Sequence, residues 1–356
     1  MKETKVLVVF TGGTIGTVQA DGFLSLGGEG PRRALLELFG AQKQPLYEER
    51  FGTRIMFETM CPYEILSENL NGEKLELLWQ AVSRGIEKDY DGVIITTGTD
   101  SLAYVSAAMG YLFADPPVPV VMVSANYPLE DRRSNALSNF EGAVLLILEG
   151  SHKGVFCSYR NEKEHYMHIA TRLLPQDNYS DQVFSVKNSF YAKLEAGKSG
   201  PEWRQKESGE EAVRGEKAAS DGAKTQPLRC ENLADIHISF QRPYPGMQFE
   251  FPASCDAVLL DTYHSGTLPV RESGFSEFMK RAHEKHIPVF VTGVPEGLTY
   301  ETVAAYEKEG ACVCPPASPA AMYLKLWLLL ANGMEPQKYM KTPLGQDIVR
   351  EAADID

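Results

Sequence analysis

Two polar turns, each directly after an apolar run, contain residues that could do chemistry. Residues 5–10 (KVLVVF) lead into residues 11–16 (TGGTIG), and residues 92–96 (GVIIT) lead into residues 97–101 (TGTDS). A threonine hydroxyl such as that of Thr14 is a weak nucleophile that a neighbouring group must activate. Glycine lets a ligand approach the backbone closely, and N–H groups at a helix start can hold a carboxylate or a developing oxyanion. The two turns therefore have the groups needed to attack a carbonyl carbon.

A third polar cluster, Ser67 and Glu68, follows a strand pattern at residues 54–57. Because the carboxyl ends of parallel strands meet at one edge of a sheet, we expect this cluster to lie beside the two turns. Together the three clusters would provide hydroxyls, glycine N–H groups and the carboxylates of Glu68 and Asp100. Since carboxylates pair with amino groups, the set suits a small zwitterion whose carbonyl group is attacked.

The same residues have purely structural interpretations, which their types alone leave open. Thr11, Thr14 and Asp100 could cap the segments that follow them, because threonine and aspartate are common at helix starts. Ser67 and Glu68 could belong to an ordinary loop. Other chemistries are disfavoured, since the first turn lacks the G-x-G-x-x-G pattern and neither a P-loop lysine nor a G-x-S-x-G elbow is present. No histidine lies in the first turn, which disfavours Ser-His-Asp hydrolysis.

Composition and charge limit the classes of partner. The 356 residues include 43% hydrophobic and 23% charged side chains, with a net charge of −13, as in an ordinary soluble globular protein. Such an acidic chain is disfavoured as a partner of nucleic acid or of anionic membranes. The first apolar run is too short for a secretion signal and no later run is long enough to span a bilayer. We therefore expect a cytoplasmic protein.

The six cysteines are scattered along the chain, and without an export signal we expect reduced thiols rather than disulfides. Cys312 and Cys314 form a lone pair, with no second pair of ligands nearby at the spacing of a zinc site. We therefore expect no metal.

Alternating strand and helix patterns predict an α/β protein with two domains. Residues 1–190 are expected to form the larger domain, with a mostly parallel sheet covered on both faces, and residues 235–356 a smaller α/β domain. Between them, residues 195–225 contain almost no large apolar side chains and cannot offset their ordering entropy. We therefore expect residues 191–234 to be a linker with a polar, flexible insertion. Residues 18–31, which are rich in glycine, predict a mobile loop that could act as a lid.

Several of these stretches resemble signature sequences of the L-asparaginase/glutaminase family, the bacterial-type threonine amidohydrolases. Residues 8–16 (VVFTGGTIG) resemble the first signature and residues 94–101 (IITTGTDS) the second. Residues 66–69 (LSEN) match the substrate-binding serine loop of the family. Residues 260–267 (LDTYHSGT) and 319–330 are similar to its carboxyl-domain loop and its final helix. The resemblance covers nearly the whole chain apart from the predicted insertion.

The resemblance implies a role for each matched residue. Thr14 takes the position of the threonine that attacks the side-chain amide, and Thr99 that of the second catalytic threonine. Asp100 takes the position that binds the α-amino group. The other implied substrate contacts are Gly13, Ser67, Glu68 and Gly98, together with Thr267 from a neighbouring subunit. The implied reaction converts L-asparagine and water to L-aspartate and ammonia through an ester on Thr14, without cofactors, in a homodimer or homotetramer.

The sequence departs from the family in residues that matter for catalysis. The nearest match to the family's catalytic lysine is Arg172, and arginine stays protonated and cannot accept a proton. If Arg172 fills that place, proton transfer must use water or Asp100 instead. Where the family has a lid tyrosine, residues 21–25 (DGFLS) provide Phe23 or Leu24, with Ser25 as a shorter substitute. Ser101 replaces a threonine and keeps the hydroxyl.

These observations support three hypotheses. The first is an asparaginase-type amidohydrolase whose substrate is a small amino-acid amide. The second is a catalytically weak paralogue that binds an amino acid as a sensor, which the missing lysine and tyrosine suggest. The third is a hydrolase of another small amide, which the altered lid residues suggest.

Overall fold

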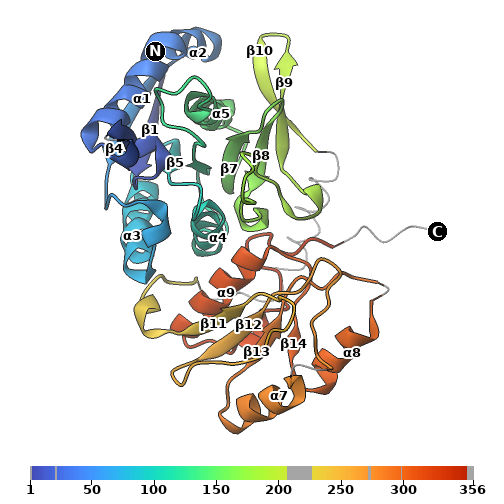
Figure 1. Ribbon diagram of the computed structural model, residues 1–356. Coiled ribbons are helices and arrows are strands. Elements are labelled where there is room, and N and C mark those ends of the chain that lie inside the picture. Colours follow the sequence, from blue (N-terminus) through green and yellow to red (C-terminus); the bar gives the residue numbers. More distant parts are fainter. Residues whose placement is uncertain (1, 21, 207–226, 272–273, 298, 351–356) are drawn as a thin grey trace, which may run out of the picture.

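The computed structural model describes residues 2–20, 22–206, 227–271, 274–297 and 299–350. They form an eight-stranded sheet, a separate four-stranded sheet and a two-stranded hairpin (Figure 1). The predicted α/β architecture with a larger and a smaller sheet is confirmed. The large sheet has the strand order β10-β9-β8-β7-β6-β5-β1-β4. Its strands are β1 (Lys2–Phe10), β4 (Thr53–Met60), β5 (Gly92–Thr96), β6 (Val120–Val123), β7 (Val155–Arg160), β8 (His165–Ile169), β9 (Ala192–Gly197) and β10 (Gly200–Gln205).

The five strands from β4 to β7 in this order are parallel, and β1 lies between β4 and β5. Helices α1 (Glu29–Gln42), α2 (Gln44–Phe51) and α5 (Ala136–Glu149) contribute to the core on one face. Helices α3 (Gly72–Glu87) and α4 (Leu102–Leu112) contribute to the core on the other face. Because both faces are covered, the central strands are continuous apolar runs.

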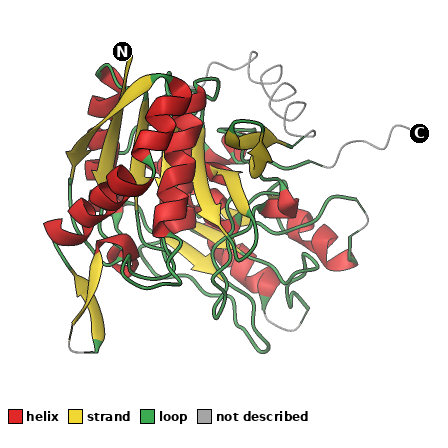
Figure 2. Cartoon of the chain, turned by 90° about the horizontal axis from the view of Figure 1, so that it is seen from above, coloured by secondary structure: helices red, strands yellow, loops and turns green. Residues whose placement is uncertain are grey.

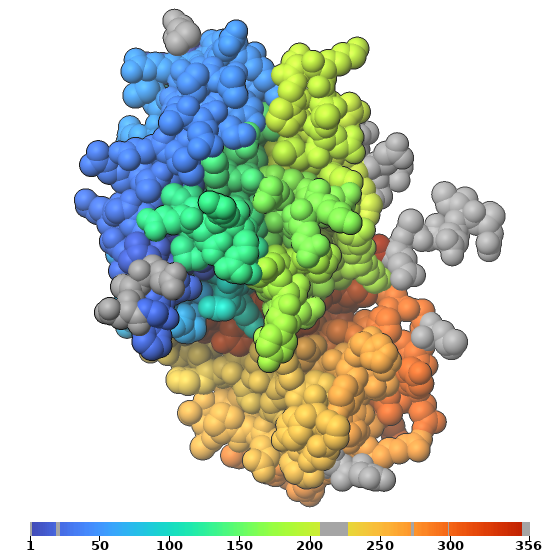
Figure 3. Space-filling model, turned by 45° about the horizontal axis from the view of Figure 1, so that its top comes forward, coloured from blue at the N-terminus to red at the C-terminus, as the bar shows by residue number. Residues whose placement is uncertain are grey.

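The smaller domain has a parallel sheet with the order β11-β12-β13-β14. Its elements are β11 (Ile238–Gln241), β12 (Ala257–Leu260), α7 (Phe275–Glu284), β13 (Val289–Val291), α8 (Glu301–Lys308), β14 (Cys312–Val313), α9 (Pro319–Ala331) and α10 (Pro336–Tyr339). Helix α9 packs against α4 of the larger domain, and both belong to one hydrophobic core. The smaller domain lies against one side of the larger domain (Figure 3). Helix α4, which follows the second polar turn (residues 97–101), is therefore in contact with both domains.

The prediction of a linker over residues 191–234 is wrong for the first part of this range. Residues 192–205 form β9 and β10, an antiparallel extension of the large sheet. Trp203 is buried and its indole N–H donates to the carbonyl of Gly142 (3.0 Å). Only one face of this edge hairpin packs against the protein, and the other face is solvated. β9 and β10 therefore contain few large apolar side chains, although the two strands are part of the sheet. The rest of the predicted insertion, residues 207–226, lies outside the described residues.

The predicted lid loop is also more regular than expected. It contains an antiparallel hairpin of β2 (Thr17–Ala20) and β3 (Phe23–Leu26), followed at once by α1. The hairpin projects from the body of the molecule (Figure 2). Phe23 and Leu24 are exposed by 77% and 50%. No helix in the described ranges is long and apolar enough to cross a membrane.

Candidate active site

The turns after β1 and β5 touch through their glycines. Gly13 has a φ of +70°, and a Cβ built on it would lie 2.2 Å from the backbone nitrogen of Gly98. Because no side chain fits between them, the two backbones approach as closely as glycine alone allows. The two predicted threonine turns therefore lie side by side at the carboxyl edge of the large sheet.

The segment after β4 joins the same edge through Ile65. The N–H of Ile65 donates to the carbonyl of Thr11 (3.1 Å), and the N–H of Gly13 donates to the carbonyl of Ile65 (3.1 Å). This pairing brings Ser67 against the second turn, since a Cβ on Gly98 would lie 2.3 Å from Ser67 Oγ. All three predicted clusters thus come together. The N–H of Gly13 is occupied by Ile65, so the expected contribution of this residue is close approach rather than a free donor.

Two side-chain hydrogen bonds fix the polar groups of the edge. The buried hydroxyl of Ser67 donates to Asp100 Oδ2 (2.9 Å), so this carboxylate has a defined position. The hydroxyl of Thr11 donates to the carbonyl of Thr96 (2.7 Å) and ties the end of β1 to β5. Thr11 is therefore structural. Glu68 is exposed on the short helix η2 (Ser67–Asn69).

The hydroxyls of Thr14 and Thr99 have no hydrogen-bond partner among the described residues. Thr14 begins the short helix η1 (Thr14–Gly16), which has no side-chain cap. Thr99 precedes α4, whose first turn is likewise not capped by a side chain. Both threonines are only partly buried. The capping interpretation of Thr14 is therefore not met, and both hydroxyls are available to a ligand.

The space beneath the turns is packed. It is lined by Thr11, Gly13, Tyr63, Thr97 and Gly98, among others, and has no room for a water molecule. Burial raises the pKa of Tyr63 above its usual value, so this phenol stays neutral. Close packing of these side chains and backbone groups keeps the two turns in one arrangement.

Two cavities meet at Asp100. The first, here called the aromatic cavity, has a volume of about 240 Å³ and is lined by Ser67, Glu68, Leu70, Leu75, Asp100, Ser101, Tyr104, Tyr323, Leu324 and Trp327. The second, here called the loop cavity, has a volume of about 290 Å³ and is lined by Thr99, Asp100, Asn126 and residues 175–181. Sequence reasoning missed residues 175–181, which form no regular element and match no motif. The described lining of both cavities contains no lysine, arginine or histidine.

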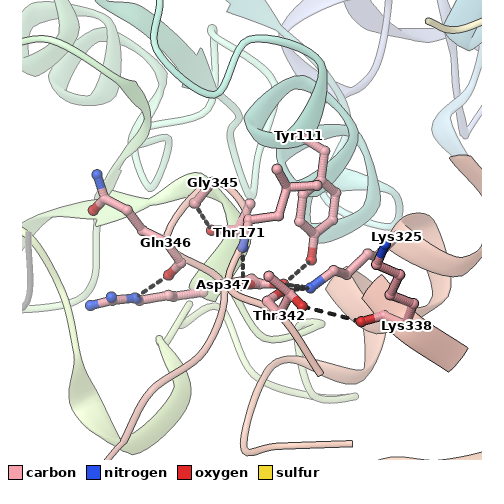
Figure 4. Close-up of polar contacts among 10 residues, drawn as sticks. Tyr111, Thr171, Lys325, Lys338, Thr342, Gly345, Gln346 and Asp347 are labelled. Atoms are coloured by element: carbon pink, nitrogen blue, oxygen red, sulfur yellow. Dashed lines mark hydrogen bonds and ion pairs between the residues drawn. The ribbon is translucent and has the colours of Figure 1, made fainter. Parts of the chain in front are cut away.

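Arg172 is not in the lining of the cavity that Thr99 and Asp100 border, where the resemblance implied a catalytic place for it. It lies in the short helix η3 (Ala170–Arg172), is buried, and its Nε donates to the carbonyl of Gln346 (2.6 Å). The preceding Thr171 donates to the carbonyl of Gly345 (2.6 Å) and packs against Gly110, near the carboxyl end of α4 (Figure 4). Thr99 precedes the opposite end of this helix. Arg172 lines neither cavity and instead holds the carboxyl-terminal segment.

The same segment takes part in a buried ion pair of the smaller domain, which a tyrosine of α4 contacts from the larger domain. Lys325 Nζ lies 2.7 Å from Asp347 Oδ2 and also donates to the carbonyl of Thr342 (2.6 Å). Tyr111 of α4 donates its phenol hydrogen to Asp347 (3.1 Å; Figure 4). Burial raises the pKa of the Tyr111 phenol, and the nearby carboxylate of Asp347 raises it further. One sequence signal could have found this cluster: Lys325 is the lone charge within the apolar run of α9.

Thr267 lies in the loop after β12 of the smaller domain. Its hydroxyl is 3.1 Å from that of Ser265, and Thr267 lines neither cavity of its own chain. Its contribution to a neighbouring subunit stays a prediction.

Comparison with known proteins agrees with this geometry. The family model described as "Asparaginase, N-terminal" matches residues 5–200, which include all three polar clusters. An L-asparaginase from Thermococcus kodakarensis is 26% identical over 295 residues, covering 81% of this chain and 79% of that protein. A subunit of a glutamyl-tRNA(Gln) amidotransferase from Methanobrevibacter smithii is 23% identical over 338 residues, covering 91% of this chain and 72% of that subunit. The solved thermostable L-asparaginase from Thermococcus kodakarensis has a TM-score of 0.71 at 20% identity, covering 98% of this chain and 100% of its own.

Proposed function

This chain belongs to the asparaginase family, and on that premise we propose that it hydrolyses L-asparagine to L-aspartate and ammonia with Thr14 as the nucleophile. One observation carries the proposal: Gly13 and Gly98 are in backbone contact, so the turns of Thr14 and Thr99 adjoin. They adjoin at the carboxyl edge of a parallel sheet, where open α/β folds bind ligands.

The reaction is an acyl transfer in two steps. The Oγ of Thr14 bonds to the carbonyl carbon of the side-chain amide, the C–N bond breaks, and the nitrogen leaves as ammonia after taking up a proton. Water then attacks the resulting ester, which releases aspartate and returns the hydroxyl to Thr14. Asp100, held by Ser67 at 2.9 Å, accepts hydrogen bonds from the α-ammonium group of the substrate.

The proton of Thr14 needs an acceptor other than a lysine. Neither cavity has a basic residue in its described lining, and Arg172 is engaged elsewhere. We propose that the proton passes through water or Asp100.

The same observation favours a second candidate function, a weakly catalytic paralogue that binds an amino acid as a sensor. A third candidate, suggested by the amidotransferase relative, is hydrolysis of glutamine or another amide. We further propose a cytoplasmic homodimer or homotetramer in which Thr267 of one subunit approaches the site of another. The six unpaired cysteines are consistent with a reducing compartment.

The experiment that tests the proposal is a coupled ammonia-release assay on L-asparagine, L-glutamine and other small amides. We expect turnover of L-asparagine above that of the other amides. Calorimetry on the same samples separates the alternatives. Saturable binding of asparagine without ammonia release would favour the sensor, and faster release from another amide would replace asparagine as the substrate.

A further inference from the structure

The base of the β2–β3 hairpin is hydrogen-bonded to the turn that carries Thr14. Gly27 directly follows β3, and its N–H donates to the carbonyl of Gly16 (2.8 Å). The N–H of Gly16 in turn donates to the carbonyl of Gly13 (2.8 Å). The hydroxyl of Thr17, the first residue of β2, donates to the carbonyl of Thr14 (2.9 Å). The hairpin base and this turn therefore form one hydrogen-bonded unit.

An arginine of α1 joins this unit to the segment after β4. The Nε of Arg32 donates to the carbonyl of Gly28 at the hairpin base (2.8 Å), and its Nη2 donates to Oε2 of Glu64 (3.2 Å). The side chains of Arg32 and Glu64 are only 18% and 22% exposed, so solvent screens this ion pair less than an exposed one. Glu64 directly precedes Ile65, whose backbone pairs with the first polar turn. The pair therefore connects two segments that both contact this turn.

The second oxygen of the Glu64 carboxylate lies close to the turn of Thr14. Its Oε1 is buried and has no hydrogen-bond partner in the described part of the chain. A Cβ built on Gly16 would lie 3.9 Å from it. Because a carboxylate that loses its counterion is drawn toward water, the guanidinium of Arg32 keeps this group in its place beside the turn.

We propose that Arg32 and Glu64 are positioning residues for the hydroxyl of Thr14. This inference rests on the proposed function, in which Thr14 is the nucleophile. The contacts form a closed ring, which runs from the turn of Thr14 through the hairpin base to Arg32, across to Glu64, and back to the turn through Ile65. The ring fixes the turn on both sides. Such fixing matters because a shift of about 1 Å in a reacting group can cost about 10²-fold in rate.

The proposed contact of the substrate's ammonium group lies outside this ring. Asp100 is held by the hydroxyl of Ser67 (2.9 Å). Arg32 and Glu64 are absent from the described lining of both cavities that Asp100 borders. Loss of the ion pair should therefore lower kcat and leave the affinity for an amino acid nearly unchanged.

Arg32→Met tests the inference, and Arg33→Met is its control. Arg33 is the next residue of α1, and its ion pair with Glu37 is exposed, with side chains 81% and 61% accessible. We expect kcat for L-asparagine to fall at least about tenfold in Arg32→Met and to stay unchanged in Arg33→Met. Calorimetry with L-aspartate should give the same stoichiometry, and a Kd within about twofold, for both variants.

Two results with Arg32→Met would overturn the inference. One is an unchanged kcat in the folded variant. The other is a fall in kcat that is matched by an equal fall in the stoichiometry for L-aspartate. Such a loss would reflect a smaller folded fraction rather than a displaced hydroxyl.

Glu64→Met tests whether the two residues act as a pair. It should reproduce the loss in kcat, and the double variant with Arg32→Met should add less than about threefold to that loss, because both changes break the same contact. Losses that multiply in the double variant would contradict a shared role.

Hydrogen exchange decides the inference if the unmodified protein hydrolyses no amide, in which case the proposed function fails. The amides of Gly13 and Gly16 take part in the hydrogen bonds of the ring. Exchange in a peptide covering residues 11–18 that is at least about tenfold faster in Arg32→Met than in Arg33→Met would support the inference. Equal exchange in the two variants would overturn it.

Discussion

Gly98 is a residue at which the candidate site leaves no room for a side chain. A Cβ there would lie 2.3 Å from Ser67 Oγ and 3.1 Å from the Cα of Gly13. Contacts this short require a neighbour to move. Since Ser67 positions Asp100, the disturbance would reach the substrate contact.

Gly98→Ala should therefore reduce kcat/KM by at least about tenfold and lower the free energy of unfolding by about 1–3 kcal/mol. Steady-state kinetics and denaturant unfolding measure the two effects. Gly30→Ala is the matched control, because Gly30 lies in α1 with nothing within 4 Å of its built Cβ. An unchanged kcat/KM in Gly98→Ala would contradict the close apposition of Ser67 and the second turn.

Two histidines of β8 give a prediction for the elements around the site. His165 accepts or donates a hydrogen bond with Ser158 (2.9 Å), and His168 does so with Ser185 (2.8 Å). Burial lowers the pKa of each to about 3. Both are therefore neutral in the folded protein at pH values where the unfolded chain, with a histidine pKa near 6.5, binds protons.

Stability from these histidines is present above about pH 6.5 and is lost as the pH falls from there toward 3. Each should contribute a slope of up to about 1.4 kcal/mol per pH unit. Denaturant unfolding between pH 7 and 4.5 measures the slope. His165→Gln should reduce it by the contribution of one histidine, up to about 1.4 kcal/mol per pH unit. His264→Gln, at an exposed loop position, is the control. A slope that His165→Gln leaves unchanged would contradict the burial of a neutral imidazole.

The elements that carry the site could be predicted from sequence, whereas several others could not. β1, β5 and α4 are buried, so their apolar runs are long and their polar turns stand out. β9 and β10 form an antiparallel edge whose solvated face hides the pattern, and β14 has two residues. The loop cavity depends on residues 175–181 approaching Thr99 across the fold, and no local pattern encodes that approach. For the same reason local resemblance places Arg172 at the site, although the fold turns it toward Gln346.

Across the molecule as a whole, the buried pair of Lys325 and Asp347 in the smaller domain is linked to the larger domain by the hydrogen bond from Tyr111 to Asp347. Both side chains are almost fully buried, and Tyr111 brings α4 into the same network. Removing one partner of such a pair leaves an uncompensated charge, which typically costs about 3–5 kcal/mol. The pair therefore contributes to the position of α4, whose first turn follows Asp100.

Lys325→Met should lower the free energy of unfolding by about 3–5 kcal/mol, and the double variant Lys325→Met with Asp347→Asn should lose less, because no charge is left buried. Denaturant unfolding of the single and double variants measures the coupling. The exposed pair Arg33–Glu37 is the control, and Arg33→Ala should cost less than about 0.5 kcal/mol. Equal losses in the single and double variants would contradict a coupled pair.

The role proposed for Thr14 is tested by ammonia release from L-asparagine, compared between the unmodified protein, Thr14→Ala and Thr59→Ala. Thr59 is an exposed threonine of β4 and serves as the control. We predict that Thr14→Ala remains folded and loses at least about 10³-fold in kcat, while Thr59→Ala retains full activity. Ammonia release by folded Thr14→Ala at the rate of the unmodified protein would contradict the assignment of Thr14 as the nucleophile.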